Sequence, residues 1–152
     1  MADIECTVEN NIATVMLNRP AVRNAVTLAM WKDVARVFRD LGRSRDVRAI
    51  VFAGAGGNFS VGADVSEFSV VRANVQDSTD YEIAVDASSD AIAGVPQPVI
   101  AAIDGYCLGG GCHLSMACDF RFASPAAQIG IPSANLSIVY GVRSTKRLLG
   151  LV

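Results

Sequence analysis

Three consecutive glycines, Gly109 to Gly111, precede the only histidine of the sequence, His113, at the start of a predicted helix that runs to about Ala117. Glycine has no Cβ, so another molecule can approach the backbone N–H groups closely. At a helix N-terminus these N–H groups have no partner within the helix, and the helix dipole adds partial positive charge. Such a site suits a phosphate or a carbonyl oxygen that becomes anionic during a reaction. Close packing of the helix against a neighbouring element explains the glycines equally well.

A second turn of small residues, Gly62-Ala63, lies in the stretch NFSVGADVSEF, after a predicted buried strand and its loop. Two turns with exposed backbone, each following a buried strand, could direct their N–H groups at one oxygen atom. The carboxylate of Asp64, which comes next, is expected to cap neighbouring backbone N–H groups rather than to catalyse.

The hydrophobic pattern predicts the first elements that must position these turns. Two stretches of alternating polarity, 3–9 and 12–18, flank Asn10-Asn11, which predicts a β-hairpin with a tight turn. An amphipathic helix is expected over 27–42, and the residues of its apolar face are Trp31, Val34, Ala35, Phe38 and Leu41.

Short apolar runs predict the strands that lead into the two turns. The runs 47–54 and 99–103 are expected to be buried strands, and 119–124 a further strand. Residues 66–80 are polar and weakly patterned, which is typical of a mobile flap or an irregular helix. An alanine-rich helix is expected over 81–94, where the following prolines stop it. The recurring strand, turn and helix predict an α/β fold.

Composition narrows the class of protein. The 152 residues fit one domain, with 51% hydrophobic and 18% charged residues, which argues against disorder. The net charge of −2, without a block of like charges, favours neither nucleic acid nor a membrane surface as partner. The cysteines lack a Cys-x-x-Cys pair, which predicts buried thiols in a reducing cytoplasm and no metal site. No secretory signal is apparent at the start.

Three motifs, in this order and at this spacing, resemble the crotonase superfamily, the enoyl-CoA hydratase and isomerase family. They are LNRPAVRNAV (17–26), NFSVGADVSEF (58–68) and QPVIAAIDGYCLGGGCHLSMACDFRFAS (97–124). The resemblance runs from about Ile12 to the last residue and implies a spiral of strand-strand-helix repeats over 1–152. The C-terminal helices with which related proteins cover the acyl pocket and build trimers are expected to be missing. A full-length form is expected to be a homotrimer or hexamer, and the 152 residues alone to expose an apolar face and self-associate.

The same resemblance implies the ligand and the residues that hold it. The family binds an acyl-CoA or enoyl-CoA thioester, so coenzyme A would enter as part of the substrate, without a separate cofactor or metal. Two backbone N–H groups of the family stabilise a thioester enolate, and these fall on Ala63 and Gly110. The remaining substrate-binding positions implied by the resemblance are Asn24, Ala25, Val26, Asp64, Val65, Ser66 and Gly109.

The sequence departs from the family at the residues that handle protons. Family hydratases carry one glutamate just after GGGC and another inside a segment like FGxPE, and His113 and Ser133 stand there in this sequence. The family's PGxGG segment also differs and reads VYGVR over 139–143. General acid–base assistance contributes roughly 10²–10⁴-fold to a rate, so ordinary two-glutamate hydration is not expected.

Several functions therefore stay open. His113 is expected on the same helical face as Gly110, and an imidazole with a pKa near 6.5 can act as acid or base at neutral pH. With Ser133 opposite, His113 could shuttle protons in an isomerase or decarboxylase, or assist attack by Ser133 or water in thioester hydrolysis. The structural alternatives are that His113 is a hydrogen-bonded, partly buried residue without a chemical role and that Ser133 is a helix N-cap. Tyr140 is a separate candidate, whose phenol could donate a proton. A CoA-thioester-binding paralogue without catalysis is the rival hypothesis.

Overall fold

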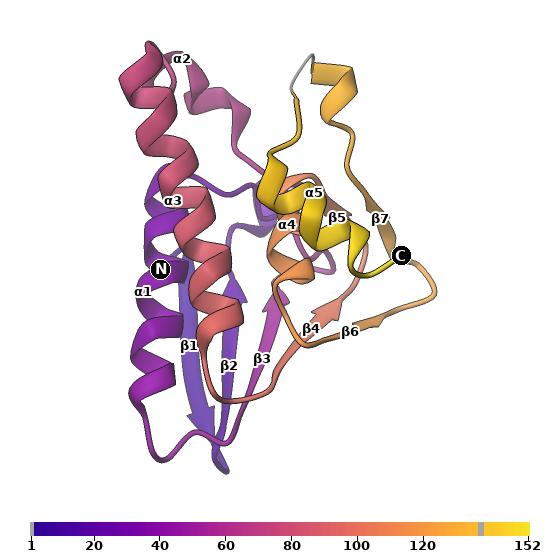
Figure 1. Ribbon diagram of the computed structural model, residues 1–152. Helices are drawn as coiled ribbons and strands as arrows, with labels where there is room; N and C mark the ends of the chain where they lie inside the picture. The colour runs from indigo at the N-terminus through magenta and orange to yellow at the C-terminus, as the bar shows by residue number, and fades with distance from the viewer. Residues whose placement is uncertain (1, 137–138) are drawn as a thin grey trace.

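The computed structural model describes residues 2–136 and 139–152. The described elements follow one another as a mixture of strands, helices and short 3₁₀ turns (Figure 1). In chain order they are β1 (Ile4–Glu9), β2 (Ile12–Leu17), η1 (Pro20–Val22), α1 (Leu28–Arg43), β3 (Ala49–Gly54), η2 (Val65–Glu67), α2 (Phe68–Val71), α3 (Val75–Gly94), β4 (Val99–Ile103), β5 (Tyr106–Leu108), α4 (Gly110–Met116), β6 (Phe120–Ala123), β7 (Gln128–Gly130), η3 (Ser133–Leu136) and α5 (Val142–Leu149).

Within the described residues, the strands form a larger sheet in the order β1-β2-β3-β4-β6 and a smaller one that pairs β5 with β7. The hairpin of β1 and β2 is antiparallel, as the sequence predicts, and Asn10 and Asn11 take φ angles of 51° and 65° at its turn. The other pairs are parallel, and helices α1, α3 and α4 make the connections between β2, β3, β4 and β6. This alternation confirms the predicted α/β fold.

The core lies between the larger sheet and the two long helices α1 and α3, which run side by side across it (Figure 1). The predicted apolar face of α1 is confirmed, because all of its residues are buried. The hydroxyl of Thr27 accepts a hydrogen bond from Met30 N at 3.2 Å and so caps the start of the helix. Phe38 of α1 packs edge-to-face on Phe52 of β3, with ring centroids 5.3 Å apart.

The segment before β4 is more regular than the sequence predicts. Helix α3 begins at Val75, ahead of the expected residue 81, and the short turns η2 and α2 precede it. Asn74 caps α3, since its side-chain oxygen accepts a hydrogen bond from Asp77 N at 2.9 Å. The polar first turns of α3 are exposed, and for this reason they show no hydrophobic periodicity to read.

The cysteines only partly follow the prediction. Cys107, Cys112 and Cys118 are buried, and burial raises the pKa of the Cys107 and Cys118 thiols to about 12. Cys6 on the edge strand β1 is instead exposed. No group of potential ligands suited to a metal ion occurs among the residues that the structure describes. None of the described helices combines the length and apolar character needed to cross a membrane.

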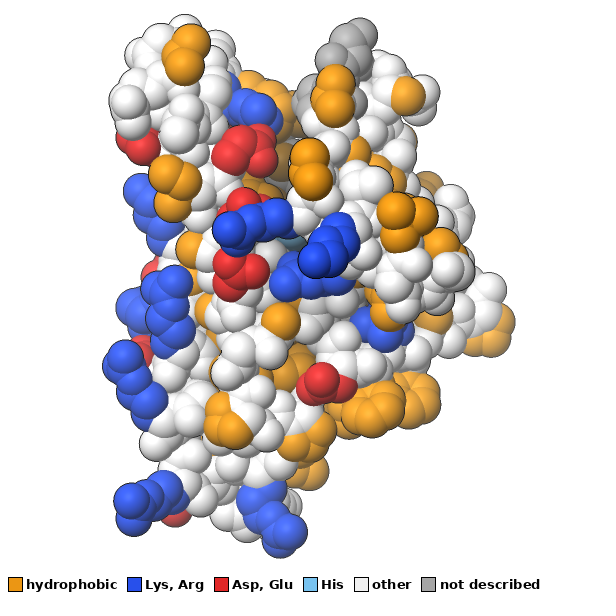
Figure 2. All heavy atoms as spheres, in the orientation of Figure 1, with side chains coloured by type: hydrophobic (Ala, Val, Ile, Leu, Met, Phe, Trp, Pro, Cys, Tyr) orange, Lys and Arg blue, Asp and Glu red, His pale blue; other side chains and the backbone are white. Residues whose placement is uncertain are grey.

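The expected exposed apolar face is present. Strand β6 forms the other edge of the larger sheet, and its Phe120 and Phe122 side chains are 54% and 66% exposed. Figure 2 shows apolar side chains scattered over the face of the molecule that is turned to the viewer in Figure 1.

Candidate active site

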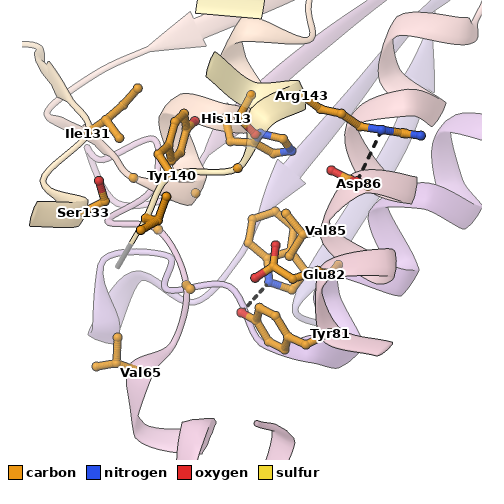
Figure 3. Close-up of a pocket in the computed structure, with 18 of the residues that line it drawn as sticks. Val65, Tyr81, Glu82, Val85, Asp86, His113, Ile131, Ser133, Tyr140 and Arg143 are labelled. Carbon is orange, nitrogen blue, oxygen red and sulfur yellow. Dashed lines mark hydrogen bonds and ion pairs between the residues drawn. The ribbon is translucent and has the colours of Figure 1, made fainter. Parts of the chain in front are cut away.

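A pocket of about 390 Å³ lies between α3, the start of α4 and the segment that leads into α5. Its lining is largely apolar and includes Trp31, Phe68 and Val85. Charged side chains, among them Glu82 and Asp86 of α3, join this lining (Figure 3). An apolar pocket with a few polar groups is the usual form of a small-molecule site.

The two small-residue turns meet at the wall of this pocket, where Gly62, Ala63, Gly109 and Gly110 all contribute to its lining. A Cβ on Gly62, whose φ is +98°, would lie 2.9 Å from Gly110 N. A Cβ on Gly110 would lie 3.2 Å from Ala63 N and 2.9 Å from the Trp31 ring. Glycine is therefore needed at both positions, because a side chain would push the two turns apart.

Neither the Ala63 N–H nor the Gly110 N–H makes a hydrogen bond to any residue that the structure describes. Their neighbours are bonded: Gly62 N donates to Ser60 Oγ, Asp64 N to Val26 O and Gly109 N to Gly130 O. Those bonds hold each turn in place and leave one N–H from each turn free to donate a hydrogen bond to a ligand oxygen. The two turns thus lie next to each other at the pocket wall.

His113 lies in the middle of α4, and only 2% of it is exposed. It lines the pocket together with Gly110, as its spacing predicts. Its Nδ1 is 2.6 Å from Ser144 Oγ, and its Nε2 is buried without a hydrogen-bond partner among the described residues. His113 is therefore bonded to Ser144 of α5, which the sequence analysis did not single out, and not to Ser133.

Burial lowers the pKa of His113 below its ordinary value of 6.5, and the nearby Arg147 guanidinium acts in the same direction. The Asp86 and Asp90 carboxylates and the Val85 carbonyl oppose this shift of the pKa. The imidazole is accordingly neutral at neutral pH. A neutral imidazole can accept the Ser144 hydroxyl proton at Nδ1.

Ser133 also lines the pocket, but on the wall away from His113 (Figure 3). The interpretation of Ser133 as a helix N-cap is wrong, because Ser133 is itself the first residue of η3. The turn is closed instead by a hydrogen bond from Asn135 N to Pro132 O at 3.0 Å.

Tyr140 lines the pocket between these two residues (Figure 3). Its hydroxyl is buried and has no hydrogen-bond partner among the described residues. Burial raises the pKa of Tyr140 to about 12, while the neighbouring Ser144 hydroxyl acts to lower it. The phenol is protonated at neutral pH and is available as a hydrogen-bond donor.

Of the remaining positions expected to bind substrate, some line the pocket and others do not. Asn24 to Val26 are buried and lie outside the pocket lining. Asn24, at a φ of 57°, ties loops together: its side-chain oxygen accepts from Arg19 N at 2.9 Å, and its Nδ2 donates to Ala55 O and Asn58 O at 2.8 Å. The structure therefore gives Asn24 an architectural role.

Asp64 caps the chain locally, as expected from the sequence. Its carboxylate accepts hydrogen bonds from Ser66 N and Ser66 Oγ at 3.2 and 2.6 Å, and it pairs with Arg19 at 2.8 Å. Hydrogen bonds from Ser66 and Arg19 lower the pKa of Asp64. Asp64 and Ser66 lie outside the pocket lining, whereas Ala63 and Val65 belong to it.

Comparison with known proteins places this geometry in a family. The family model described as enoyl-CoA hydratase/isomerase matches residues 7–151. The chain is 35% identical over 145 residues to the short-chain-enoyl-CoA hydratase of Clostridium acetobutylicum, covering 95% of this chain and 55% of that protein. It is also 36% identical over 144 residues to the peroxisomal fatty acid beta-oxidation multifunctional protein MFP2 of Arabidopsis thaliana, covering 94% of this chain and 20% of that protein.

Solved structures give the same result for the fold. An enoyl-CoA hydratase/carnithine racemase from Magnetospirillum magneticum superposes with a TM-score of 0.93 at 36% identity, over 97% of this chain and 56% of that one. The chain thus spans about half the length, or less, of the relatives that it matches. Its three motifs, its fold and the matched region agree: the chain belongs to the enoyl-CoA hydratase/isomerase family.

Proposed function

We propose that this chain binds the acyl part of a CoA thioester in the pocket and stabilises negative charge on the thioester oxygen with the Ala63 and Gly110 N–H groups. The observation that carries the proposal is the pair of N–H groups on one apolar wall, each without a hydrogen-bond partner among the described residues. Fixed donors of this kind contribute roughly 10²–10³-fold each to a rate when they face a developing oxyanion.

The substrate class rests on the family and on the shape of the site. The Clostridium relative is named as a short-chain-enoyl-CoA hydratase, which supports an acyl-CoA or enoyl-CoA ligand here. The pocket suits an acyl chain, because aromatic and aliphatic side chains dominate its lining. Two-glutamate hydration is outside the proposal, since the resemblance puts His113 and Ser133 at the positions where family hydratases carry carboxylates.

A CoA-thioester binder without catalysis is the second candidate. Its support is the state of His113, whose Nδ1 is engaged by Ser144 and whose Nε2 is buried. An imidazole held in this way cannot place and activate a water as the two glutamates of the family hydratases do. Turnover of a bound thioester distinguishes this candidate from the first.

Trp31 makes the proposal directly testable, because it is the only tryptophan and it lines the pocket. Titration of the full chain with butyryl-CoA is expected to change Trp31 fluorescence in a saturable way and more tightly than titration with free CoA. No saturable change, or equal affinity for the two compounds, would refute the proposed acyl site. Incubation with crotonyl-CoA, a 3-enoyl-CoA and butyryl-CoA, followed by mass spectrometry, then separates an enzyme from a binder.

A further inference from the structure

We propose that the Ser144 hydroxyl is a nucleophile that attacks the carbonyl carbon of a bound acyl thioester, with His113 as its general base. The pocket would then hydrolyse saturated acyl-CoA thioesters as well as bind them. This inference rests on the proposed function, because it needs the thioester carbonyl to lie against the Ala63 and Gly110 N–H groups.

The geometry of the imidazole is the first support. Ser144 Oγ and His113 Nδ1 are 2.6 Å apart, a distance suited to transfer of the hydroxyl proton to the ring. The other ring nitrogen, Nε2, is buried and lies toward α3 (Figure 3). Nε2 is enclosed, so His113 can exchange a proton only through Nδ1, with the Ser144 hydroxyl or with a substrate atom that lies beside it. The nucleophile and the base are thereby assigned by contact.

The placement of Ser144 is the second support. Ser144 belongs to the same pocket lining as Ala63 and Gly110. Helix α5, which carries Ser144, is anchored to α3 by ion pairs: Arg143 lies 2.9 Å from Asp90 and 3.6 Å from Asp86, and Arg147 lies 3.6 Å from Asp90. A nucleophile on an anchored helix keeps its position relative to its base.

The Tyr140 hydroxyl is the third support. It is buried beside Ser144, close enough for the Ser144 hydroxyl to act on the pKa of the phenol. An oxygen atom of a ligand bound at Ser144 would therefore lie within reach of the Tyr140 hydroxyl, which can donate a hydrogen bond to it.

The proposed hydrolysis needs only the Ser144 hydroxyl, the His113 imidazole, the two N–H groups and water. The Ser144 Oγ–H proton moves to His113 Nδ1 as Oγ bonds to the thioester carbon, and the carbonyl electron pair moves to the oxygen held by the two N–H groups. When that pair returns, the C–S bond breaks, and the CoA thiolate takes the proton from Nδ1. Water then attacks the acyl ester and gives a proton to His113 Nδ1; the bond from the acyl carbon to Oγ breaks, the carboxylic acid leaves, and Oγ takes the proton from Nδ1 to restore the Ser144 hydroxyl.

The experiment incubates the full chain with butyryl-CoA, quenches it in acid, and measures free CoA, butyrate and the mass of the peptide that contains Ser144. Wild type is expected to release CoA and butyrate and to carry a butyryl group on Ser144. Ser144→Ala is expected to lose the adduct and to release CoA at least roughly 10²-fold more slowly, while still binding butyryl-CoA by Trp31 fluorescence.

Two further variants sharpen the result. Ser115→Ala is the matched control, because Ser115 is a buried serine of α4 whose Oγ donates to Cys112 O at 2.9 Å, outside the pocket lining. It is expected to keep the wild-type rate. Ser144→Cys preserves a nucleophile if the alanine variant does not fold, and it is expected to carry the butyryl group at the same position.

The outcomes separate the two proposals. Saturable binding of butyryl-CoA with neither CoA release nor an adduct would overturn the role of Ser144 and leave the proposed function standing. CoA release unchanged in a folded Ser144→Ala variant, or an adduct absent from Ser144→Cys, would overturn it as well. Failure of wild type to bind butyryl-CoA would overturn both.

Discussion

The Nδ1 atom of His113 lies 2.6 Å from the Oγ atom of Ser144, across the interface between α4 and α5. This contact buries a titratable group that carries no formal charge at neutral pH. Because the imidazole is enclosed, its protonation is linked both to the stability of the fold and to the chemistry of the pocket.

His113 is expected to make the protein less stable as the pH falls. Its pKa in the folded state lies below the ordinary 6.5, so the unfolded chain binds the proton more readily. The stability that comes from keeping the ring neutral is present above pH 6.5 and declines as the pH falls toward the folded pKa. Each unit of depression corresponds to about 1.4 kcal/mol. Arg147, Asp86 and Asp90 are the charged groups that act on the pKa of the ring: Arg147 lowers it, and the two carboxylates raise it.

Urea unfolding at about pH 7.5 and about pH 5.5 measures this effect. Wild type is expected to lose more free energy of unfolding between the two values than His113→Gln, which has no titratable ring. Equal losses in the two proteins would contradict the assignment of this pH dependence to His113.

Gly110→Ala is expected to remove most acyl-thioester binding and turnover. The added Cβ would lie 2.9 Å from the Trp31 ring and 3.2 Å from Ala63 N, so the two turns must separate. Displacing one oxyanion donor lowers a rate by roughly 10²–10³-fold, and overpacking costs about 1–3 kcal/mol of stability. Butyryl-CoA titration and urea unfolding measure the two effects. Gly94→Ala is the control, because a Cβ there meets no atom within 4 Å, and wild-type affinity is expected.

Tyr81→Phe is expected to destabilise the folded protein at the pocket lining, where Tyr81 meets Trp31. Trp31 Nε1 donates a buried hydrogen bond to the Tyr81 hydroxyl at 2.9 Å, which links α1 to α3. Burial raises the pKa of Tyr81 to about 12, so the phenol stays protonated. Removing the hydroxyl leaves the indole N–H unpaired, at a cost of about 1–3 kcal/mol in the free energy of unfolding. Tyr106→Phe is the control, because no hydrogen bond to its hydroxyl is found among the described residues; a similar loss there would contradict the prediction.

The parts of the fold that local signals determine could be predicted from the sequence. Asn10-Asn11 has the residue types of a tight turn, and the 3.6-residue period of α1 marks its buried face. Strands β5 and β7 have three residues each, too short to show a period. The start of α3 was missed because a cap at Asn74, and not an apolar stripe, defines it.

The candidate site likewise has one part that could be predicted from the sequence and one part that could not. The closeness of the turns that contain Ala63 and Gly110 could be predicted, because each turn of small residues follows a buried strand. The partner of His113 could not be found in this way, because Ser144 is 31 residues further on and reaches the ring only through the docking of α5. The one available signal was the departure from PGxGG over 139–143, which introduces Tyr140 and Arg143 into the pocket lining.

Self-association through β6 is the last expected property. Phe120 and Phe122 alternate with Arg121 on this edge strand, so both rings lie on one face and are more than half exposed. Exposed aromatic side chains on an unpaired edge favour contact with another copy of the chain. Sedimentation velocity is expected to show concentration-dependent association of wild type, weakened in Phe122→Ser. Val8→Thr on the opposite edge strand β1 is the control and is expected to associate like wild type. A wild-type chain that stays monomeric at all concentrations would contradict the prediction, because the two rings would then be stable in water without a partner.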